Sequence, residues 1–189
     1  MSKIFIISEI GINHNGDLEL AKRMIKESKL CGADAVKFQI IDPDRLVSDK
    51  NQLFKYEVLI AKDPDQTETV EEPLYDILCR RYMNDEEWKV LKEHCDSLDI
   101  AFFSTIGFDE ELNLVERIGC DSVKIASADI NHIPLIRKVA RTGTCVQLDT
   151  GMATIGEIEA AVDVIRSEGN EKIIVHNCPS GYPARLESI

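Results

Sequence analysis

The sequence has no run of about 18 apolar residues and no basic N-terminal segment that leads into one. We therefore expect neither a membrane span nor a signal peptide, and we expect a cytoplasmic location. A basic patch is also lacking, and the net charge is -12. Because nucleic acids and anionic membranes attract basic surfaces, this charge balance argues against both as partners.

The cysteines show no C-x-x-C spacing, although there are six of them. That spacing is typical of zinc sites and of thiol–disulfide motifs, and cytosolic proteins keep their thiols reduced. Free cysteine is also among the residue types most often buried. We therefore predict reduced, mostly buried thiols at Cys31, Cys79, Cys95, Cys120, Cys145 and Cys178.

No G-x-G-x-x-G motif follows the first predicted strand, which weakens the case for a dinucleotide-binding fold. What the sequence has instead is a regular alternation of short apolar strands with amphipathic helices. Strands are predicted at residues 4–7, 35–38, 100–103, 122–125, 145–148 and 172–175. Five helical segments separate these six strands. Such alternation predicts a parallel sheet that is covered by helices.

A parallel sheet of this kind can close into a (β/α)8 barrel or stay open as a doubly wound sheet. The barrel is favoured because every predicted strand delivers polar residues at its carboxyl end, where barrel enzymes keep their active sites. Six strands and five helices are fewer than eight of each. We therefore predict one α/β domain over residues 1–189, an incomplete TIM-type barrel that is a fragment of a longer protein. Such a fragment is expected to expose apolar surface.

Residues 41–83 interrupt this alternation. The segment is mostly polar, with an acidic run over 63–72 and short amphipathic pieces at 53–61 and 74–82. An insertion of this length in a compact domain is usually a lid or a binding loop. We predict that role for 41–83, and the alternative is a solvated decoration of the surface.

Two lysines, Lys37 and Lys124, lie near the ends of the second and fourth predicted strands of an otherwise acidic protein. Two ammonium groups with nearby hydroxyls, here Thr105 and Ser127, form a site for a phosphate or a carboxylate. Carboxyl ends of parallel strands meet at one rim of a barrel. The other polar residues expected at that rim are Glu9, Gln39, Ser104, Asp149, Thr150, His176 and Asn177.

Other interpretations of these side chains remain open. Each lysine can simply pair with a local carboxylate such as Glu9 or Asp129. Alternatively, one lysine forms a Schiff base with a carbonyl substrate. His14 and His176 would lie near the same rim, but no carboxylate is spaced to complete a metal-ligand set, so structural roles are favoured for both.

Several motifs together resemble the sialic acid synthase family, the N-acetylneuraminate synthases and their legionaminic and pseudaminic acid relatives. The motifs lie at residues 9–16 (EIGINHNG), 33–39 (ADAVKFQ), 103–105 (FST), 123–127 (VKIAS), 150–152 (TGM) and 181–183 (GYP). The resemblance implies a (β/α)8 transferase that condenses phosphoenolpyruvate with an N-acylated aldose and releases phosphate. The product is a nonulosonic, sialic-type acid. A divalent metal, manganese or magnesium, and a homodimer are also implied.

The resemblance also implies roles for particular residues. Phosphoenolpyruvate would be bound by Lys37, Thr105, Lys124, Ser127 and Ser180. Gln39 and Tyr182 match positions that contact the acceptor sugar, and Glu9 matches a catalytic acid near the metal and its water. The metal-binding histidines of the family lie further along the barrel, so no metal ligand is expected before Ile189.

Three residues depart from the family pattern. Asp149 stands where serine is usual, Asp129 where glutamate is usual and Asn177 where histidine is usual. The carboxylate of Asp149 is expected to weaken phosphate binding or to select another acceptor. The family's antifreeze-like C-terminal domain lies outside these residues, so we expect little or no synthase activity from them alone. The alternatives are a lysine-dependent barrel aldolase or dehydratase, and an inactive truncated barrel that serves as a binding module.

Overall fold

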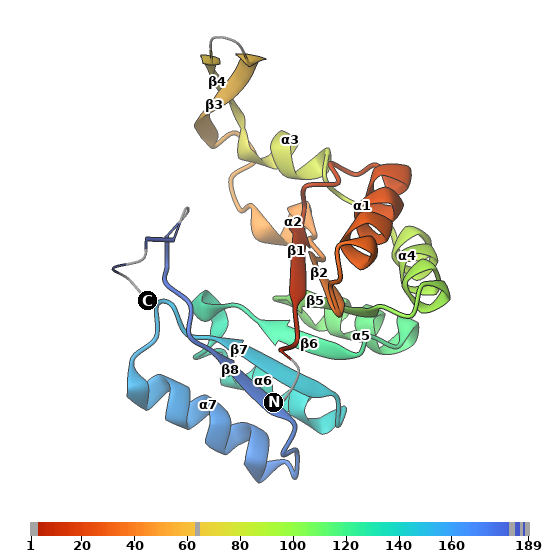
Figure 1. Ribbon diagram of the computed structural model, residues 1–189. Helices are drawn as coiled ribbons and strands as arrows, with labels where there is room; N and C mark the ends of the chain where they lie inside the picture. Colours follow the sequence, from red (N-terminus) through yellow and green to blue (C-terminus); the bar gives the residue numbers. More distant parts are fainter. Residues whose placement is uncertain (1–3, 63–64, 182–183, 186, 188–189) are drawn as a thin grey trace.

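The computed structural model describes residues 4–62, 65–181, 184–185 and 187, and its main feature is a six-stranded parallel sheet. The strands are β1 (Ile7–Gly11), β2 (Ala35–Gln39), β5 (Ala101–Ile106), β6 (Ser122–Ile125), β7 (Cys145–Asp149) and β8 (Ile173–His176). They lie in the sheet in the same order as in the chain. The sheet curves into half of a barrel (Figure 1), which confirms the predicted incomplete α/β barrel.

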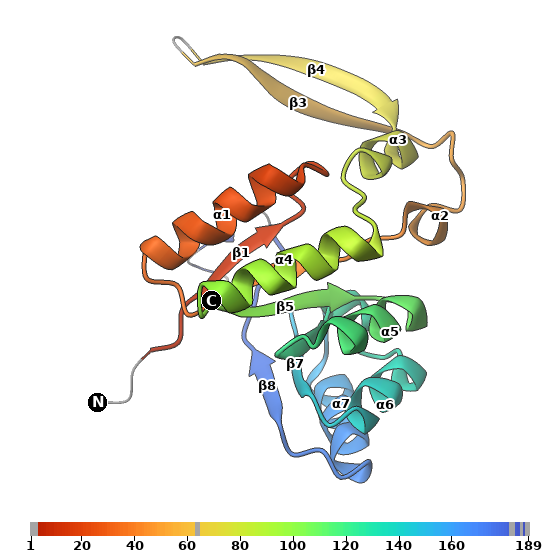
Figure 2. The ribbon, with the colours of Figure 1, turned by 90° about the vertical axis from the view of Figure 1, so that its right-hand side faces the viewer.

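Helices connect consecutive strands and lie along the outer face of the curved sheet (Figures 1 and 2). They are α1 (Leu18–Leu30), α4 (Asp85–Ser97), α5 (Asp109–Ile118), α6 (Ile133–Arg141) and α7 (Ile155–Ser167). Asn84 and Thr154 form capping boxes at the starts of α4 and α7. Gly119, with a φ of 71°, ends α5 in the left-handed conformation that glycine adopts easily. No helix in the described part of the chain is long and apolar enough to cross a membrane.

The hydrophobic core lies between the sheet and these helices. The rings of Phe38 and Phe102 stack with centroids 5.4 Å apart, and Trp88 from α4 packs edge-on against Phe38 at 5.7 Å. Side chains alternate between the two faces of a strand. Because Phe38 faces the helices, its neighbours Lys37 and Gln39 face the inside of the half-barrel. The same alternation directs Thr105 and Lys124 inward. Ser104 of β5 was expected at the rim, but this is wrong, because it is in register with Phe38 and is buried on the helix side of the sheet.

Residues 41–83 form a separate feature at the rim of the half-barrel. They contain two short helices, α2 (Pro43–Leu46) and α3 (Leu74–Cys79), and an antiparallel hairpin of β3 (Leu53–Lys62) and β4 (Asp65–Pro73). Figure 2 shows the hairpin extending away from the sheet. The amphipathic pattern at 53–61 thus belongs to a strand. A lid function for the segment stays a prediction.

The first strand differs from the one expected. The prediction of a strand over 4–7 that is buried on both faces is wrong. β1 begins at Ile7, and the side chains of Ile4, Phe5 and Ile6 are 76%, 61% and 51% exposed. β1 is at the edge of the sheet and pairs only with β2. At the other edge, Ile174 and Val175 of β8 are nearly half exposed. The expected exposure of apolar surface is therefore confirmed at both outer strands.

The cysteines are free thiols with different degrees of burial. Cys95 is on the buried face of α4, and burial raises the pKa of its thiol to about 12. The expectation of mostly buried thiols is wrong, because Cys120, Cys145 and Cys178 are only partly buried and two thiols are exposed, those of Cys31 and Cys79. They lie at the C-terminal ends of α1 and α3, outside the contact between helices and sheet.

Candidate active site

A cleft of about 510 Å³ opens on the inner side of the half-barrel, at the carboxyl ends of the strands. It is lined by six of the eight residues to which the sequence assigns a role in binding or catalysis: Glu9, Lys37, Gln39, Thr105, Lys124 and Ser127. They come from β1, β2, β5 and β6 and from the turn after β6. The predicted meeting of these side chains at one rim is confirmed.

Lys37 is a buried cation with one carboxylate beside it. Its Nζ lies 3.1 Å from Glu9 Oε1, and the two residues are register partners on β2 and β1. The Lys37 side chain is 5% exposed, whereas that of Glu9 is 54% exposed. Burial lowers the pKa of Lys37, and the charge of Lys124 adds to this effect while Glu9 opposes it. A desolvated ammonium of this kind interacts strongly with an anion.

Lys124 forms the second ion pair of the cleft. Its Nζ lies 2.7 Å from Asp149 Oδ2, and the two side chains are only 16% and 18% exposed. The sequence allowed each lysine to pair with a local carboxylate. This holds for Lys37 and Glu9, but the partner of Lys124 is Asp149 on the neighbouring strand β7, and not Asp129. Asp129 lies in the turn after β6, where burial raises the pKa of its carboxyl group.

Thr105 presents a hydroxyl group towards the cleft. Its Oγ1 is buried and has no hydrogen-bond partner among the described residues. Thr105 lies on β5 in register with Lys124 on β6, so both side chains reach the same part of the cleft. Buried polar groups are normally paired, and an exception at a cleft is a candidate contact for a ligand. Ser127 lines the cleft from the 3-10 turn over 127–129.

A hydrogen-bonded chain of three side chains supports the inner face of the sheet beside this cleft. His176 Nε2 lies 2.8 Å from Gln147 Oε1, and Gln147 Nε2 donates to Ser122 Oγ at 2.6 Å. Burial lowers the pKa of His176, although Asp149 opposes this effect. Gln147 was not singled out from the sequence. Its alternation with Asp149 along β7 was the available signal, since residues two apart share a face of a strand.

His14 does not join His176. It is fully buried on the outer side of the sheet, with ring centroids 5.9 Å from Phe38 and 5.8 Å from Trp88. Its Nδ1 accepts a hydrogen bond from Gly16 N at 3.1 Å. Within residues 4–62, 65–181, 184–185 and 187, no three His, Cys, Asp or Glu side chains are grouped to hold a metal ion. These residues therefore do not fit a metal site of their own.

The last two predicted contacts come from the stretch after β8. Ser180 is exposed and does not line the cleft, and its Oγ packs against Gly151, where an added Cβ would lie 2.7 Å from it. β8 is the last strand of the sheet in the described part of the chain, and the stretch after it contacts the loop after β7. Tyr182, the second predicted sugar contact, lies outside the described residues.

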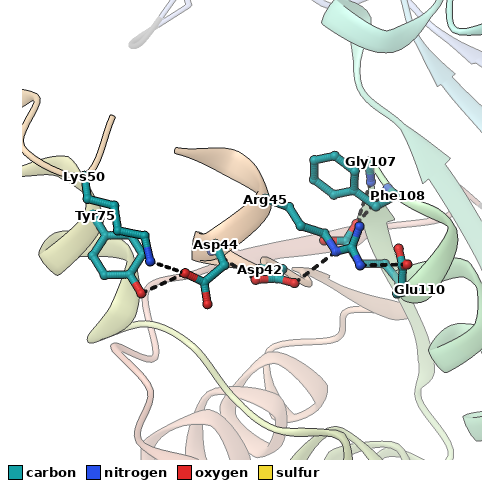
Figure 3. Close-up of polar contacts among 9 residues, drawn as sticks. Asp42, Asp44, Arg45, Lys50, Tyr75, Gly107, Phe108 and Glu110 are labelled. Carbon is teal, nitrogen blue, oxygen red and sulfur yellow. Dashed lines mark hydrogen bonds and ion pairs between the residues drawn. The ribbon is translucent and has the colours of Figure 1, made fainter. Parts of the chain in front are cut away.

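The inserted segment is attached to the loop that follows Thr105. Arg45 of α2 pairs with Asp42 at 3.2 Å and with Glu110 of α5 at 2.7 Å, and its guanidinium carbon lies 6.0 Å from the centre of the Phe108 ring (Figure 3). A second cluster, in which Lys50 and Tyr75 contact Asp44, joins α2 to α3. The segment 41–83 is thus attached next to the cleft.

A buried carboxylate, that of Glu111, binds the backbone of the same loop. Glu111 is 5% exposed, and its Oε2 accepts hydrogen bonds from the backbone N–H groups of Gly107 at 2.6 Å and of Phe108 at 3.2 Å. Burial raises the pKa of this carboxyl group to about 7, while the two backbone donors act in the opposite direction.

Comparison with known proteins identifies the family. Residues 24–189 match the NeuB family. The chain belongs to the NeuB family. Its similarity to the N,N'-diacetyllegionaminic acid synthase of Campylobacter jejuni is 34% identity over 192 aligned positions, which covers the whole of this chain and 55% of that protein. The family resemblance inferred from the motifs is thereby confirmed.

Solved structures of NeuB relatives share the fold. The N-acetylneuraminic acid synthetase from Leptospira borgpetersenii, solved with citrate, superposes with a TM-score of 0.81 at 31% identity, over 98% of this chain and 57% of that one. A truncated 3-deoxy-D-arabino-heptulosonate 7-phosphate synthase from Thermotoga maritima, at 15% identity and a TM-score of 0.62, shares the fold over 90% of this chain and 50% of its own. The NeuB chain described here spans about half the length of the curated relatives it matches.

Proposed function

We propose that the protein condenses phosphoenolpyruvate with an N-acylated aldose to form a nonulosonic acid with release of phosphate, and that these residues supply the phosphoenolpyruvate part of the active site. The observation that carries the proposal is the meeting of Lys37, Lys124 and the unpartnered hydroxyl of Thr105 in one cleft. Two cations and a free donor complement a ligand that carries a carboxylate and a phosphoryl group. Membership of the NeuB family supports this choice among anionic ligands.

In the proposed reaction, a bond forms between C3 of phosphoenolpyruvate and the aldehyde carbon of the sugar. Water adds at C2, and the bond from C2 to the phosphate oxygen then breaks. The lysines and the Thr105 hydroxyl hold the anionic groups in place, which lowers the barrier by positioning and by stabilising charge. Glu9, half exposed beside Lys37, takes the proton from the attacking water. Gln39 contacts the acceptor sugar from the same strand as Lys37.

The proposal keeps the divalent metal, manganese or magnesium, that the family resemblance implies. The described residues hold no cluster that fits it, so no step above is assigned to a metal bound here. Contacts of the sugar with Tyr182 and of phosphoenolpyruvate with Ser180, a cytoplasmic location and a homodimer likewise remain predictions.

Phosphorus NMR of phosphoenolpyruvate tests the proposal. Added protein should broaden the signal saturably, and Lys37→Met and Lys124→Met should abolish the broadening. Lys138→Met is a matched control. Lys138 is an exposed residue of α6 that pairs with Asp109 of α5, so this substitution should leave binding unchanged. If a folded protein from the whole reading frame shows no saturable effect, the proposal is wrong.

A lysine-dependent aldolase or dehydratase is the second candidate, and burial of Lys37 favours it. A lowered pKa increases the neutral amine fraction, which is the nucleophile in Schiff-base formation. The ion pair with Glu9 acts in the opposite direction, since it favours the charged form. Borohydride treatment with a carbonyl substrate distinguishes the two, because only the aldolase traps substrate covalently on Lys37 or Lys124.

A further inference from the structure

The cleft contains as many fixed negative charges as positive ones. Lys37 is paired with Glu9 at 3.1 Å, and Lys124 is paired with Asp149 at 2.7 Å. His176 also faces these groups, and burial lowers its pKa, so it adds little positive charge near neutral pH. Among the described residues that line the cleft, the charges of the two ion pairs therefore cancel. An anion that enters must compete with a carboxylate for at least one lysine.

The two ion pairs differ in how easily a ligand can separate them. Glu9 is more than half exposed, so water can solvate its carboxylate when Lys37 turns to a ligand. Asp149 is only 18% exposed, and its contact with Lys124 is the shorter of the two. Removing the partner from a carboxylate in such a place costs more free energy than removing it at the surface.

The backbone around Asp149 limits the ways in which it can move aside. Asp149 is in register with His176 on β8, and the residue that follows Asp149, Thr150, makes two hydrogen bonds. Thr150 Oγ1 donates to the carbonyl oxygen of His176 at 2.7 Å, and Thr150 N donates to Cys178 Sγ at 3.3 Å. If Asp149 moves away from Lys124, it therefore does so by a rotation of its side chain, with its backbone held in place.

We propose that Asp149 is an internal competitor of the anion site, which holds Lys124 and weakens anion binding until a phosphoryl group displaces it. This rests on the proposed function and goes beyond it, because it assigns a role to a residue that is not among the proposed phosphoenolpyruvate contacts. In this arrangement only a ligand that offers Lys124 more negative charge than a single carboxylate binds well. A phosphoryl group satisfies this condition, and a simple carboxylic acid does not.

Calorimetric titration with phosphoenolpyruvate tests this role, on the protein produced from its whole reading frame. Asp149→Asn and Asp149→Ser both remove the competing charge. Both variants should bind phosphoenolpyruvate about tenfold more tightly than the wild type. Glu159→Gln, an exposed position on α7, changes the net charge equally and should change the affinity by less than about twofold.

Pyruvate, which has the carboxylate but no phosphoryl group, provides the second measurement. Both Asp149 variants should bind pyruvate more tightly than the wild type by at most about the same tenfold factor, because every ligand that uses Lys124 must separate the same ion pair. If the wild type binds phosphoenolpyruvate and the variants bind it equally or more weakly, Asp149 is not a competitor and the inference is overturned. If neither wild type nor variants bind it, the proposed function itself is wrong.

Discussion

Thr105 and Lys124 are register partners on adjacent strands, and the hydroxyl of Thr105 is buried without a hydrogen-bond partner in the described part of the chain. A buried hydroxyl left unpaired destabilises a folded protein. Its position beside a lysine in the cleft gives it a use when an anion is bound. Ligand binding would then supply the missing acceptor, and the free energy of that hydrogen bond would contribute to affinity.

Replacement of Thr105 by valine should therefore weaken phosphoenolpyruvate binding without destabilising the fold. Valine has almost the same shape and lacks the hydroxyl. We expect the dissociation constant to rise about tenfold, as for the loss of one charge-assisted hydrogen bond. The melting temperature should stay the same or rise. Titration calorimetry and thermal unfolding measure the two quantities, and unchanged affinity in Thr105→Val would remove Thr105 from the site.

Thr150→Val is the matched control for that experiment. The Thr150 hydroxyl donates to the carbonyl oxygen of His176 at 2.7 Å, so its loss leaves a backbone acceptor unpaired. We expect the free energy of unfolding to fall by about 1 kcal/mol. A contrast between the two threonines would show that the Thr105 hydroxyl serves a ligand and the Thr150 hydroxyl serves the fold.

Lys37→Met should stabilise the protein while it abolishes binding. Burial lowers the pKa of Lys37, so the folded state holds this proton less tightly than the unfolded state does. Burying the charged lysine therefore lowers the free energy of unfolding. This loss of stability is present in full at pH values below the pKa of the folded state, and it disappears as the pH rises past the pKa of the unfolded state. At neutral pH the methionine variant should melt about 2–4 °C higher, which corresponds to about 1 kcal/mol for a chain of this size. A lower melting temperature would show that the pair with Glu9 outweighs the burial.

Glu111 should make stability depend on pH near neutrality. Its pKa of about 7 in the folded state lies above the pKa in the unfolded state. At pH values between these two, the folded state therefore binds more protons than the unfolded state does. Unfolding free energy should therefore fall as pH rises from about 4.5 to about 7, by roughly 3 kcal/mol from this group. Urea unfolding of the wild type and Glu111→Gln across that range measures the difference, because glutamine keeps the backbone contacts and does not titrate. Parallel pH profiles for the two proteins would contradict the assignment.

The outer strands should make the 189-residue polypeptide self-associate when it is produced by itself. Among the described residues, β8 has no strand partner on its outer edge, and Ile174 and Val175 are nearly half exposed. Such edges pair with other chains. Val175→Lys should reduce association measured by analytical ultracentrifugation. Met152→Lys, at a side chain that is 70% exposed in the loop after β7, tests whether added charge alone has this effect.

Much of the sheet and of the cleft could be predicted from the sequence because both depend on local patterns. The alternation of apolar strands and helices set the order of elements, and alternation within β2 placed Lys37 and Gln39 on the same face. The carboxyl-end rule for parallel strands then brought Lys124 and Thr105 to the same rim.

The remaining features depend on contacts between distant residues, which no local pattern encodes. Lys124 pairs with Asp149 and not with Asp129 because the register of β6 and β7 decides which side chains meet. His14 belongs to the polar motif at residues 9–16, yet it packs against Trp88 from a helix some seventy residues later in the chain. Residues 4–6, just before β1, are exposed because no described strand lies beside them on that side of the sheet. The composition of residues 4–7 does not show this.

The order of the strands has a consequence for protein synthesis. Each strand of the sheet pairs with the strand that precedes it along the chain, in the sequence β1, β2, β5, β6, β7 and β8. A polypeptide leaving the ribosome can therefore extend the sheet one strand at a time, without waiting for a partner that has yet to be made. Lys37, Thr105 and Lys124 are all in place once β6 has emerged. The anion site can then form early and stabilise the nascent domain if its ligand is present.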